Sequence, residues 1–546
     1  MSFKIPKNLE MLRSIQTESI VPITMNDFDL DRLMAHVYEL CAHNGRIKIS
    51  KTKPGDFVRY VSELANSGHV FGLDQDELES VLQGWLSSAV IKVGQKGKKH
   101  TALAMDYVKP ISLAIYRSGL PKGRVRSRQA DIFIYRAMVT EVEKLSDGNA
   151  RSKISELIQK AFGEGILLTG NIADEPRYDG STIDINALLA LNFFEQFEAR
   201  SGQSRINDER PILLPGAHEP IGKDAIDFLV HYGHQTSTMA GSVALSALFG
   251  LRLLQLPLRT AVACRELLRT NEWVPDVLRG DSQNPLKLFC DFTQRSGSAS
   301  DQISHKCVQR DLEVLRQFFT DRIILRSIHI AWQTSYPSEQ LSIQLYRDQL
   351  MRAVELLGEE RMQDALTFQV IQIEGSLATD SEGDEGRAVI NELRSAGLSG
   401  AQLLSRVLNE SLQREGLAKQ IQWYWNCGGL TKSYGLLKGS QKARSSWRYA
   451  PADDLLLALL AVSFVPKDGK KPRQRMPIIE LLKILKDRFG ILIDEIPEEF
   501  QSSDAQVAAI ENRQAFIRRL QLLGCFQGLS DDFAAQYVVN PMIGES

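Results

Sequence analysis

The sequence predicts a mainly α-helical, multi-domain protein, a helical array with winged-helix-like modules near both ends. Apolar residues recur at helical spacing along most of the chain. The order helix, strand, two helices, hairpin can be read near the N-terminus, and a similar order of helices and hairpin closes the chain. At 546 residues the chain also exceeds what one hydrophobic core usually holds, so we expect several domains.

Composition favours a soluble cytoplasmic protein. Hydrophobic residues make up 43% and charged residues 24%, which is ordinary for globular domains. The net charge of −2 means that any nucleic-acid binding must come from local basic patches. The six cysteines form no CxxC pair, which argues against a disulfide framework or a structural zinc site. The N-terminus lacks a signal-peptide core, and the longest apolar runs, such as 455–465, are about half of a bilayer span, so we expect no membrane partner.

Residues 1–116 are expected to form the N-terminal winged-helix-like domain. A helix over 29–43 ends at Asn44–Gly45 and precedes a short strand, 46–50. Two further helices follow, and the second of these buries Leu78, Val81, Leu82 and Trp85. A hairpin then runs from Val90–Val93 to Thr101–Val108. Its tip forms a basic wing predicted to hold DNA phosphates, with Lys96, Lys98 and Lys99.

A basic linker, residues 117–129, follows this domain. It reads RSGLPKGRVRSRQ, and its glycines and proline make a helix unfavourable. Two interpretations stay open, a solvated connection between domains or an arm that contacts phosphate. The candidate arm residues are Arg124, Arg126 and Arg128.

Residues 130–374 are expected to form a helical domain. Several of its helices are apolar on more than one side, which is typical of a multi-helix array. The predicted helices cover 132–145, 154–162, 183–197, 224–232, 240–254, 259–268, 309–319 and 341–357. Near its end, Phe368–Glu374 alternates like a strand.

No motif in this domain indicates an enzyme. Gly216–Lys223 departs from a phosphate-binding loop because five residues separate its glycines, one is Pro220, and Asp224 follows the lysine. We expect a turn there, opening a helix at Asp224. His231 and His234 have the spacing of a metal pair, with His218 upstream, but no second ligand pair accompanies them. The sequence therefore predicts no catalytic residues, no cofactor and no metal.

An acidic flexible linker, 375–387, separates this domain from a second helical domain, 388–465. The segment 423–449 interleaves aromatic rings with cations and has two interpretations. The rings and cations could stack on bases and hold phosphates, or the segment is a β-hairpin with a core of aromatic side chains and a solvated tip. The candidate phosphate contacts are Lys442, Arg444 and Arg448.

Residues 466–546 are expected to form the C-terminal winged-helix-like domain. Its first helix starts at Pro477 and ends at Gly490. A long second helix, capped by Asp504, is predicted to face the core with Val507, Ile510, Ile517, Leu520 and Leu523. Its outer face would then present Asn512, Arg513, Arg518 and Arg519. The wing carries Asp531 and Asp532, which favours protein contact over DNA contact for this module.

The closing segment LLGCFQGLSDDFAAQYVVNPM (522–542) resembles the last helix and hairpin of bacterial winged-helix modules. The large, helical chain without enzyme motifs also resembles accessory subunits of bacterial anti-phage defence systems of the Druantia or methylation-associated type. The resemblance implies a helicase, an ATPase or a methyltransferase among the partner subunits. It carries over no active-site residue.

The leading hypothesis is a non-catalytic DNA-binding or scaffold subunit of a bacterial defence complex, with double-stranded DNA as a partner. One alternative is a pure protein–protein adaptor with no role in nucleic-acid binding. Another is a metal-dependent nuclease whose site is assembled from residues distant in the sequence.

Overall fold

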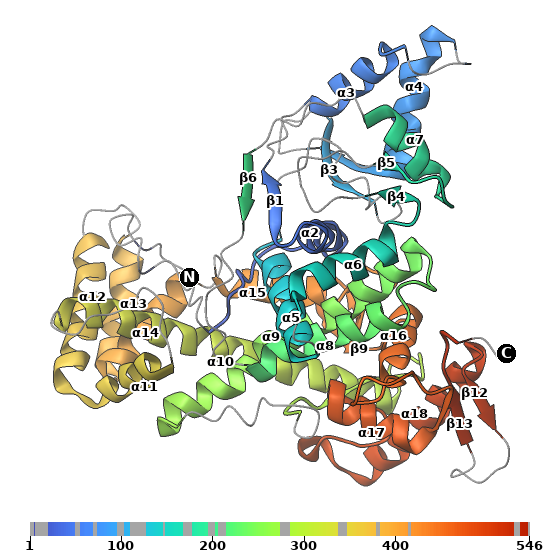
Figure 1. The fold of residues 1–546 in the computed structure, drawn as a ribbon. Helices are drawn as coiled ribbons and strands as arrows, with labels where there is room; N and C mark the ends of the chain where they lie inside the picture. Colours follow the sequence, from blue (N-terminus) through green and yellow to red (C-terminus); the bar gives the residue numbers. More distant parts are fainter. Residues whose placement is uncertain are drawn as a thin grey trace.

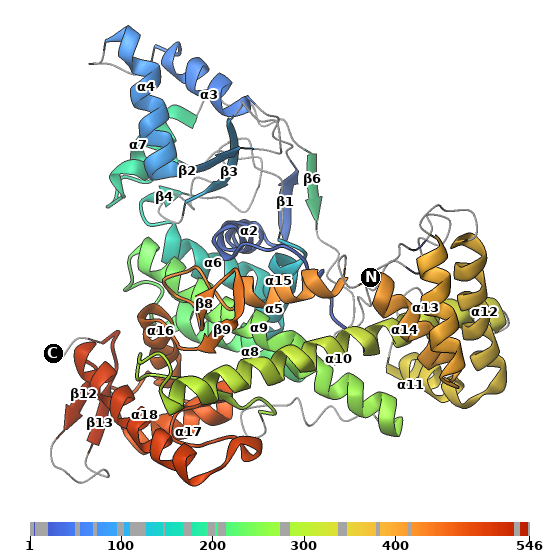
Figure 2. The same cartoon turned by 180° about the vertical axis from the view of Figure 1, so that it is seen from behind.

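A computed structural model gives the fold as a helical core with three peripheral lobes (Figure 1, Figure 2). It describes residues 5, 12, 20–49, 55–68, 72, 74–95, 103–109, 127–145, 148–167, 177–194, 202–205, 215–272, 284–336, 347–377, 383–412, 416–528 and 536–543. The predicted mainly helical class is confirmed, since helices account for most of the described chain.

Two long helices run through the core, α9 (Thr238–Thr270) and α10 (Ala299–Ser335). Around them pack α2 (Leu30–Ala42), α5 (Ala130–Leu145), α6 (Ala150–Phe162), α8 (Pro215–His231), α15 (Ala418–Cys427) and α16 (Asp453–Ser463). In the described chain, α9 is long and apolar enough to span a bilayer, with a mean hydropathy of 1.5. The other helices bury 83% of that window, as expected for the central helix of a core.

The helix α9 corrects the expectation of two separate helices over 240–254 and 259–268. It continues through Pro257, which has no backbone N–H to donate to the carbonyl oxygen of Leu253. The indole Nε1 of Trp423, on α15, donates to that oxygen instead, at 3.4 Å. Because the freed acceptor has a partner and the helix is enclosed by others, proline does not end it.

The upper lobe in Figure 1 combines elements from two stretches of sequence. From the first come α3 (Asp56–Ala65), α4 (Gln75–Trp85), a π-turn (Leu86–Val90) and the antiparallel hairpin of β2 (Ile91–Gln95) and β3 (Leu103–Val108). From the second come β4 (Ile166–Leu167), β5 (Arg177–Tyr178) and α7 (Ile185–Phe194). The helix and hairpin positions agree with the sequence prediction, but Val81 is exposed on α4.

The first helix of the expected N-terminal module, α2 (Leu30–Ala42), packs mainly on helices of the core. Asp29 caps α2 as its carboxylate accepts from the N–H of Asp31, and α2 packs on α5, α6 and α9 of the core. The strand that follows, β1 (Arg46–Ile49), pairs antiparallel with β6 (Gly202–Arg205). The domain boundaries predicted from the sequence stay predictions.

A second lobe is built from four helices, α11 (Arg347–Glu355), α12 (Glu360–Leu377), α13 (Gly383–Ser395) and α14 (Gly400–Leu412), with a 3₁₀ turn at Leu356–Gly358. The predicted strand Phe368–Glu374 is wrong, because it lies within α12. The buried residues of α12 follow a helical repeat that starts well before the alternating stretch: Met362, Leu366, Val370, Ile373 and Leu377. The acidic linker is helical at both ends, and 378–382 lie outside the described residues.

The C-terminal lobe contains β10 (Arg475–Pro477), α17 (Ile478–Phe489), β11 (Ile491–Leu492), a 3₁₀ turn (Glu498–Phe500), α18 (Ser503–Leu522), β12 (Phe526–Gly528) and β13 (Gln536–Val539). Three strands form an antiparallel sheet in the order β10–β13–β12. Gly490 ends α17 in the left-handed conformation, as predicted. The strand β11 pairs in parallel with β7 (Leu288–Phe289), which joins this lobe to the core.

The predicted orientation of α18 is wrong over the first half of the helix, whereas Leu520 is buried and Arg518 is exposed as predicted. Val507 and Ile510 are 57% and 52% exposed, whereas Asn512 is fully buried. The buried face is lined mainly by small residues, which let the helix approach its neighbours closely. These are Ala505, Ala508, Ala509, Asn512, Ala515, Phe516 and Leu520.

Candidate functional site

The predicted aromatic and basic segment forms α15 and a hairpin of β8 (Leu437–Ser440) and β9 (Ala443–Tyr449). Its rings are core side chains: Trp423, Tyr424, Tyr434, Trp447 and Tyr449 are all buried. The interpretation that these rings stack on bases is therefore wrong, and the second interpretation, aromatic side chains in a core, holds for them, although Trp423 and Tyr424 lie on α15 and not in the hairpin.

The hairpin is held firmly against α10. The hydroxyl of Ser304 donates to the carbonyl oxygen of Tyr449 and accepts from its N–H, both at 2.8 Å. His305 Nδ1 lies 2.9 Å from the carbonyl oxygen of Trp447, and the Trp447 indole donates to the carbonyl oxygen of Ser440 at 2.8 Å. These bonds fix the strand positions, so the side chains at the tip project from a rigid frame.

The predicted phosphate contacts of the hairpin fall into two groups. Lys442 and Arg444 are exposed at the tip, and Lys438 is exposed on the neighbouring strand. Arg448 is half-buried and forms an ion pair with Asp301 of α10 at 2.7 Å. Arg448 therefore helps to anchor the hairpin, while the three other cations are available to a ligand.

Of the predicted wing and arm residues, Arg128 alone lies within the described part of the chain. Lys96, Lys98, Lys99, Arg124 and Arg126 lie outside the described residues. Arg128 pairs with the carboxylate of Asp27, and its Nε donates to the Asp27 carbonyl oxygen at 3.1 Å. Its own carbonyl oxygen accepts from Thr24 N at 3.0 Å. Arg128 thus ties the start of α5 to the segment before α2.

A buried ionic cluster joins the C-terminal lobe to the core. Asp224 of α8 accepts from Arg252 of α9 and from Arg488 of α17, both at 2.6 Å. Arg488 also pairs with Asp227 at 2.8 Å. Burial disfavours the Asp224 carboxylate, yet the two guanidinium groups hold its pKa below its ordinary value. Burial likewise opposes the charge on Arg488, and the two aspartates raise its pKa above its usual range.

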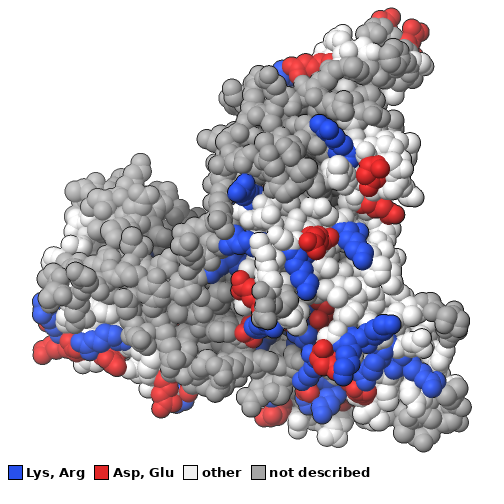
Figure 3. Space-filling model, in the orientation of Figure 1, with Lys and Arg blue, Asp and Glu red and all other residues white. Residues whose placement is uncertain are grey.

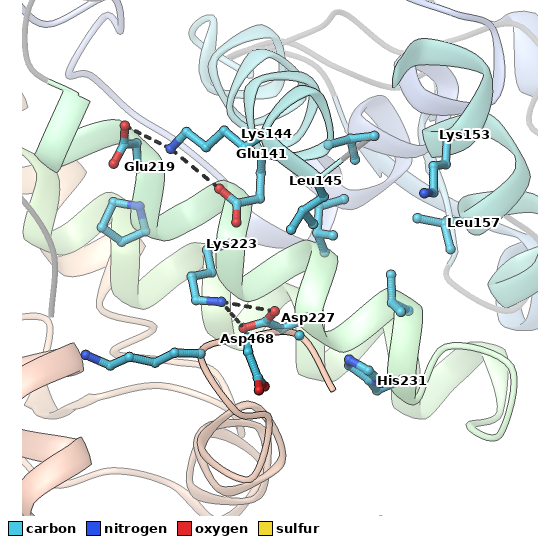
Figure 4. A pocket seen from close by; sticks show the side chains of 16 residues that line it. Glu141, Lys144, Leu145, Lys153, Leu157, Glu219, Lys223, Asp227, His231 and Asp468 are labelled. Carbon is cyan, nitrogen blue, oxygen red and sulfur yellow. Dashed lines mark hydrogen bonds and ion pairs between the residues drawn. The ribbon is translucent and has the colours of Figure 1, made fainter. Parts of the chain in front are cut away.

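Beside this cluster lies a cavity of about 550 Å³ between α5, α6, α8 and residues 467–469 (Figure 4). Its walls alternate carboxylates and ammonium groups. Lys144 pairs with Glu219 at 2.9 Å, and Lys223 pairs with Asp227 at 3.1 Å. Burial raises the pKa of Glu141 and lowers that of His231, both of which line the cavity. Such a site can bind charged groups of either sign.

Only part of this cavity could be predicted from the sequence. The pair of Lys223 and Asp227 has helical i, i+4 spacing, but nothing local indicates that α5 and the loop at 467 lie opposite it. His231 lines the cavity, whereas His218 is buried against the ring of Phe133, at 4.9 Å between ring centres. Among the described residues, no group of three or more His, Cys, Asp or Glu side chains is placed to hold a metal ion.

The segment Gly216–Lys223 has a packing role. It is part of α8 from its first turn, so the expected turn before Asp224 is wrong. Pro215 and Pro220 fit because they lie in the first and second turns, where few intrahelical N–H bonds are lost. A side chain at Gly222 would overlap the backbone of Ala137, so this glycine allows α5 and α8 to pack closely.

These features define a mainly helical, multi-lobed protein with a rigid basic hairpin and a mixed-charge cavity. The family model for methylation-associated defense system protein MAD7 matches residues 10–542. The chain belongs to that family and is therefore a component of a defence system, which implies other components as partners. No curated protein gives a significant match.

Proposed function

We propose that the protein is a non-catalytic DNA-binding or scaffold subunit of a bacterial multi-protein complex for anti-phage defence, and that it acts in the cytoplasm. Family membership supports the defence role. The observation that carries the DNA-binding part is the exposed basic tip of the β8–β9 hairpin on a rigid, aromatic-cored frame.

The hairpin suits contact with phosphate rather than with base edges. Lys438, Lys442 and Arg444 are charged, exposed and without an ion pair in the described part of the chain. Cations of this kind bind the DNA backbone regardless of sequence, with an affinity that falls steeply with salt. Because the hairpin is already ordered, little conformational entropy is lost on binding.

The same proposal includes a winged-helix module at the C-terminus. Its support is the order of elements α16, β10, α17, α18, β12 and β13, together with the strand order β10–β13–β12. In such a module α18 occupies the position of the recognition helix. Near the N-terminus, the order α2, β1, α3, α4, β2, β3 supports the second module in the same way, although β1 pairs with β6.

Duplex DNA binding measured by fluorescence anisotropy over a salt series tests this function. The hairpin variant Lys438→Ala/Lys442→Ala/Arg444→Ala and the wing variant Lys96→Ala/Lys98→Ala/Lys99→Ala should both weaken binding and flatten its salt dependence. The matched control removes three exposed cations from other elements, Lys160, Arg177 and Arg406. If the wild-type protein does not bind a duplex at low salt, the DNA-binding role is wrong.

A specific observation favours a second candidate, an adaptor that binds only proteins. Phe368 and Ile371 are 56% and 50% exposed one turn apart on α12, in a lobe far from the basic hairpin tip (Figure 2). Exposed apolar side chains that adjoin one another can form part of a surface for a partner subunit. If the protein is such an adaptor, the wild type should not bind a duplex at low salt, and Phe368→Asp/Ile371→Asp should abolish co-purification of a helicase, ATPase or methyltransferase subunit. If the variant still co-purifies with its partner subunits, this surface of α12 is not the contact.

A further inference from the structure

The connection from α16 to β10, residues 466–475, is a basic segment that we call the strap. It contains five cations and one carboxylate, Asp468. The cations are Lys467, Lys470, Lys471, Arg473 and Arg475. Lys483 of α17 follows Glu480, whose carboxylate pairs with Arg473 at 2.8 Å. The strap, Glu480 and Lys483 together therefore comprise six cations and two carboxylates.

The strap is fixed where it enters the C-terminal sheet. The N–H of Arg473 donates to the carbonyl oxygen of Phe464 at 3.0 Å. Asn540, which follows β13, donates its N–H to the carbonyl oxygen of Gln474 at 2.8 Å and its Nδ2 to that of Arg473 at 3.1 Å. Asn540 Nδ2 also lies 3.0 Å from the hydroxyl of Tyr232 on α8. The strap is thus tied to both the core and the sheet.

Part of the strap's charge is neutralised within the lobe and part is not. Lys470 pairs with Asp468 at 2.7 Å, and Arg473 pairs with Glu480. The guanidinium carbon of Arg475 lies 5.3 Å from the centre of the Tyr537 ring, which orients the cation without neutralising it. Lys471 and Lys483 are exposed and form no ion pair within the described chain.

Figure 3 shows the distribution of charged side chains on one face of the molecule. Lys and Arg side chains gather over the C-terminal lobe, at the lower right of the view, where α16, α17 and α18 lie in Figure 1. A smaller number of Asp and Glu side chains lie among them on this face. A local positive surface on a chain of net charge −2 concentrates anions at that place.

We propose that the strap and Lys483 hold the phosphate backbone of a duplex nucleic acid, as a second contact surface beside the hairpin. The inference rests on the proposed DNA-binding function and deepens it. Lys471, Arg475 and Lys483 make the phosphate contacts, and Asn540 is a positioning residue that holds the strap in place. Asp531 and Asp532 of the predicted acidic wing lie outside the described residues, and the proposal places the DNA contact of this lobe on the strap.

The test compares two charge-removing variants and one charge-preserving variant in the same anisotropy assay. Lys471→Ala/Arg475→Ala/Lys483→Ala should lower the salt slope by about 3 and weaken duplex binding on the order of tenfold or more at low salt. The control variant lacking Lys160, Arg177 and Arg406 has the same net charge and should retain the wild-type slope. The charge-preserving variant Lys471→Arg/Arg475→Lys/Lys483→Arg should also retain it.

The outcomes separate this inference from the function on which it rests. If the wild type binds a duplex and the strap variant binds equally well with the same slope, the strap is not a contact, and the proposed function stands. If the hairpin variant and the strap variant each lose part of the slope, both surfaces contact phosphate. If the wild type does not bind at low salt, both proposals are wrong. Circular dichroism and thermal melting of each variant exclude a loss caused by unfolding.

Discussion

The indole of Trp423 donates to the carbonyl oxygen of Leu253, the acceptor that Pro257 leaves without a backbone partner. Trp423 is fully buried, and its ring packs on Phe28 with 4.5 Å between ring centres. A proline inside a helix usually breaks it because the freed carbonyl oxygen goes unpaired and the ring crowds the preceding turn. Here a side chain from another helix satisfies that oxygen, and α9 continues to Thr270.

A double-mutant cycle measures this substitution of partners. Trp423→Phe leaves the Leu253 oxygen unpaired in the wild-type background, whereas in a Pro257→Ala background the new N–H can reach it. The tryptophan change should therefore lower the free energy of unfolding by about 1–2 kcal/mol more with Pro257 than with alanine there. Urea unfolding followed by far-UV circular dichroism gives the four values. Equal losses in both backgrounds would show that the bond contributes nothing.

The buried cluster around Asp224 should be the most sensitive ionic group of the core. Asp224→Asn removes the charge that two buried guanidinium groups share, so it should cost about 3–5 kcal/mol of stability or prevent folding. The control is Glu313→Gln, which breaks a solvent-exposed pair with Arg316 and should cost less than about 1 kcal/mol. Denaturant unfolding and soluble yield report both. Similar costs for the two changes would contradict the assigned role of the cluster.

The sequence predicted local features of the fold well. The helix that starts near Asp29, the helix ends at Asn44 and Gly490, and the hairpin strands near 91 and 108 depend only on neighbouring residues. Helical spacing also located most helices. What it could not supply was the partner of each face, which depends on residues hundreds of positions away. The hydrogen bond from Trp423 to the Leu253 carbonyl oxygen and the ion pair of Arg488 with Asp224 are such long-range contacts.

The helix α18 shows how that limit misdirects a prediction. Counting apolar residues placed Val507 and Ile510 inside and Asn512 outside, and both placements are wrong. The reason is that Asn512 satisfies three backbone groups at the ends of β7 and β11. Its Oδ1 accepts from Phe292 N at 2.7 Å, and its Nδ2 donates to the carbonyl oxygens of Cys290 and Ile493, each at 2.8 Å.

On α18, substituting the buried polar Asn512 should therefore lower the free energy of unfolding more than substituting the exposed apolar Val507. Asn512→Ala leaves buried donors and acceptors unpaired and should cost about 2–4 kcal/mol of unfolding free energy. Val507→Ala removes an exposed side chain from the same helix and should stay within about 0.5 kcal/mol. Chemical denaturation of both variants under one set of conditions gives the comparison. A larger loss from the valine change would mean that α18 packs with its apolar face inward after all.

Asp321 of α10 gives the chain a predictable pH dependence. Burial raises its carboxyl pKa from 3.8 to about 6, and the guanidinium of Arg265, 3.0 Å away, opposes the rise. One oxygen accepts from Gln317, while the other has no hydrogen-bond partner in the described chain. Since the folded state holds this proton more tightly than the unfolded state, the carboxylate destabilises the fold fully above about pH 6, and the penalty disappears as pH falls towards 4.

Asp321→Asn cannot ionise and should remove this dependence. The free energy of unfolding of the variant, relative to that of wild type, should be higher at about pH 7 than at about pH 4. For a pKa shift of this size the difference between the two pH values is at most about 3 kcal/mol. Arg265→Met should act in the opposite sense, because losing the guanidinium raises the Asp321 pKa further and moves the transition to higher pH. Urea unfolding of the three proteins across this pH range checks both. A stability difference between wild type and Asp321→Asn that stays constant with pH would mean that Asp321 titrates alike in the folded and unfolded chains.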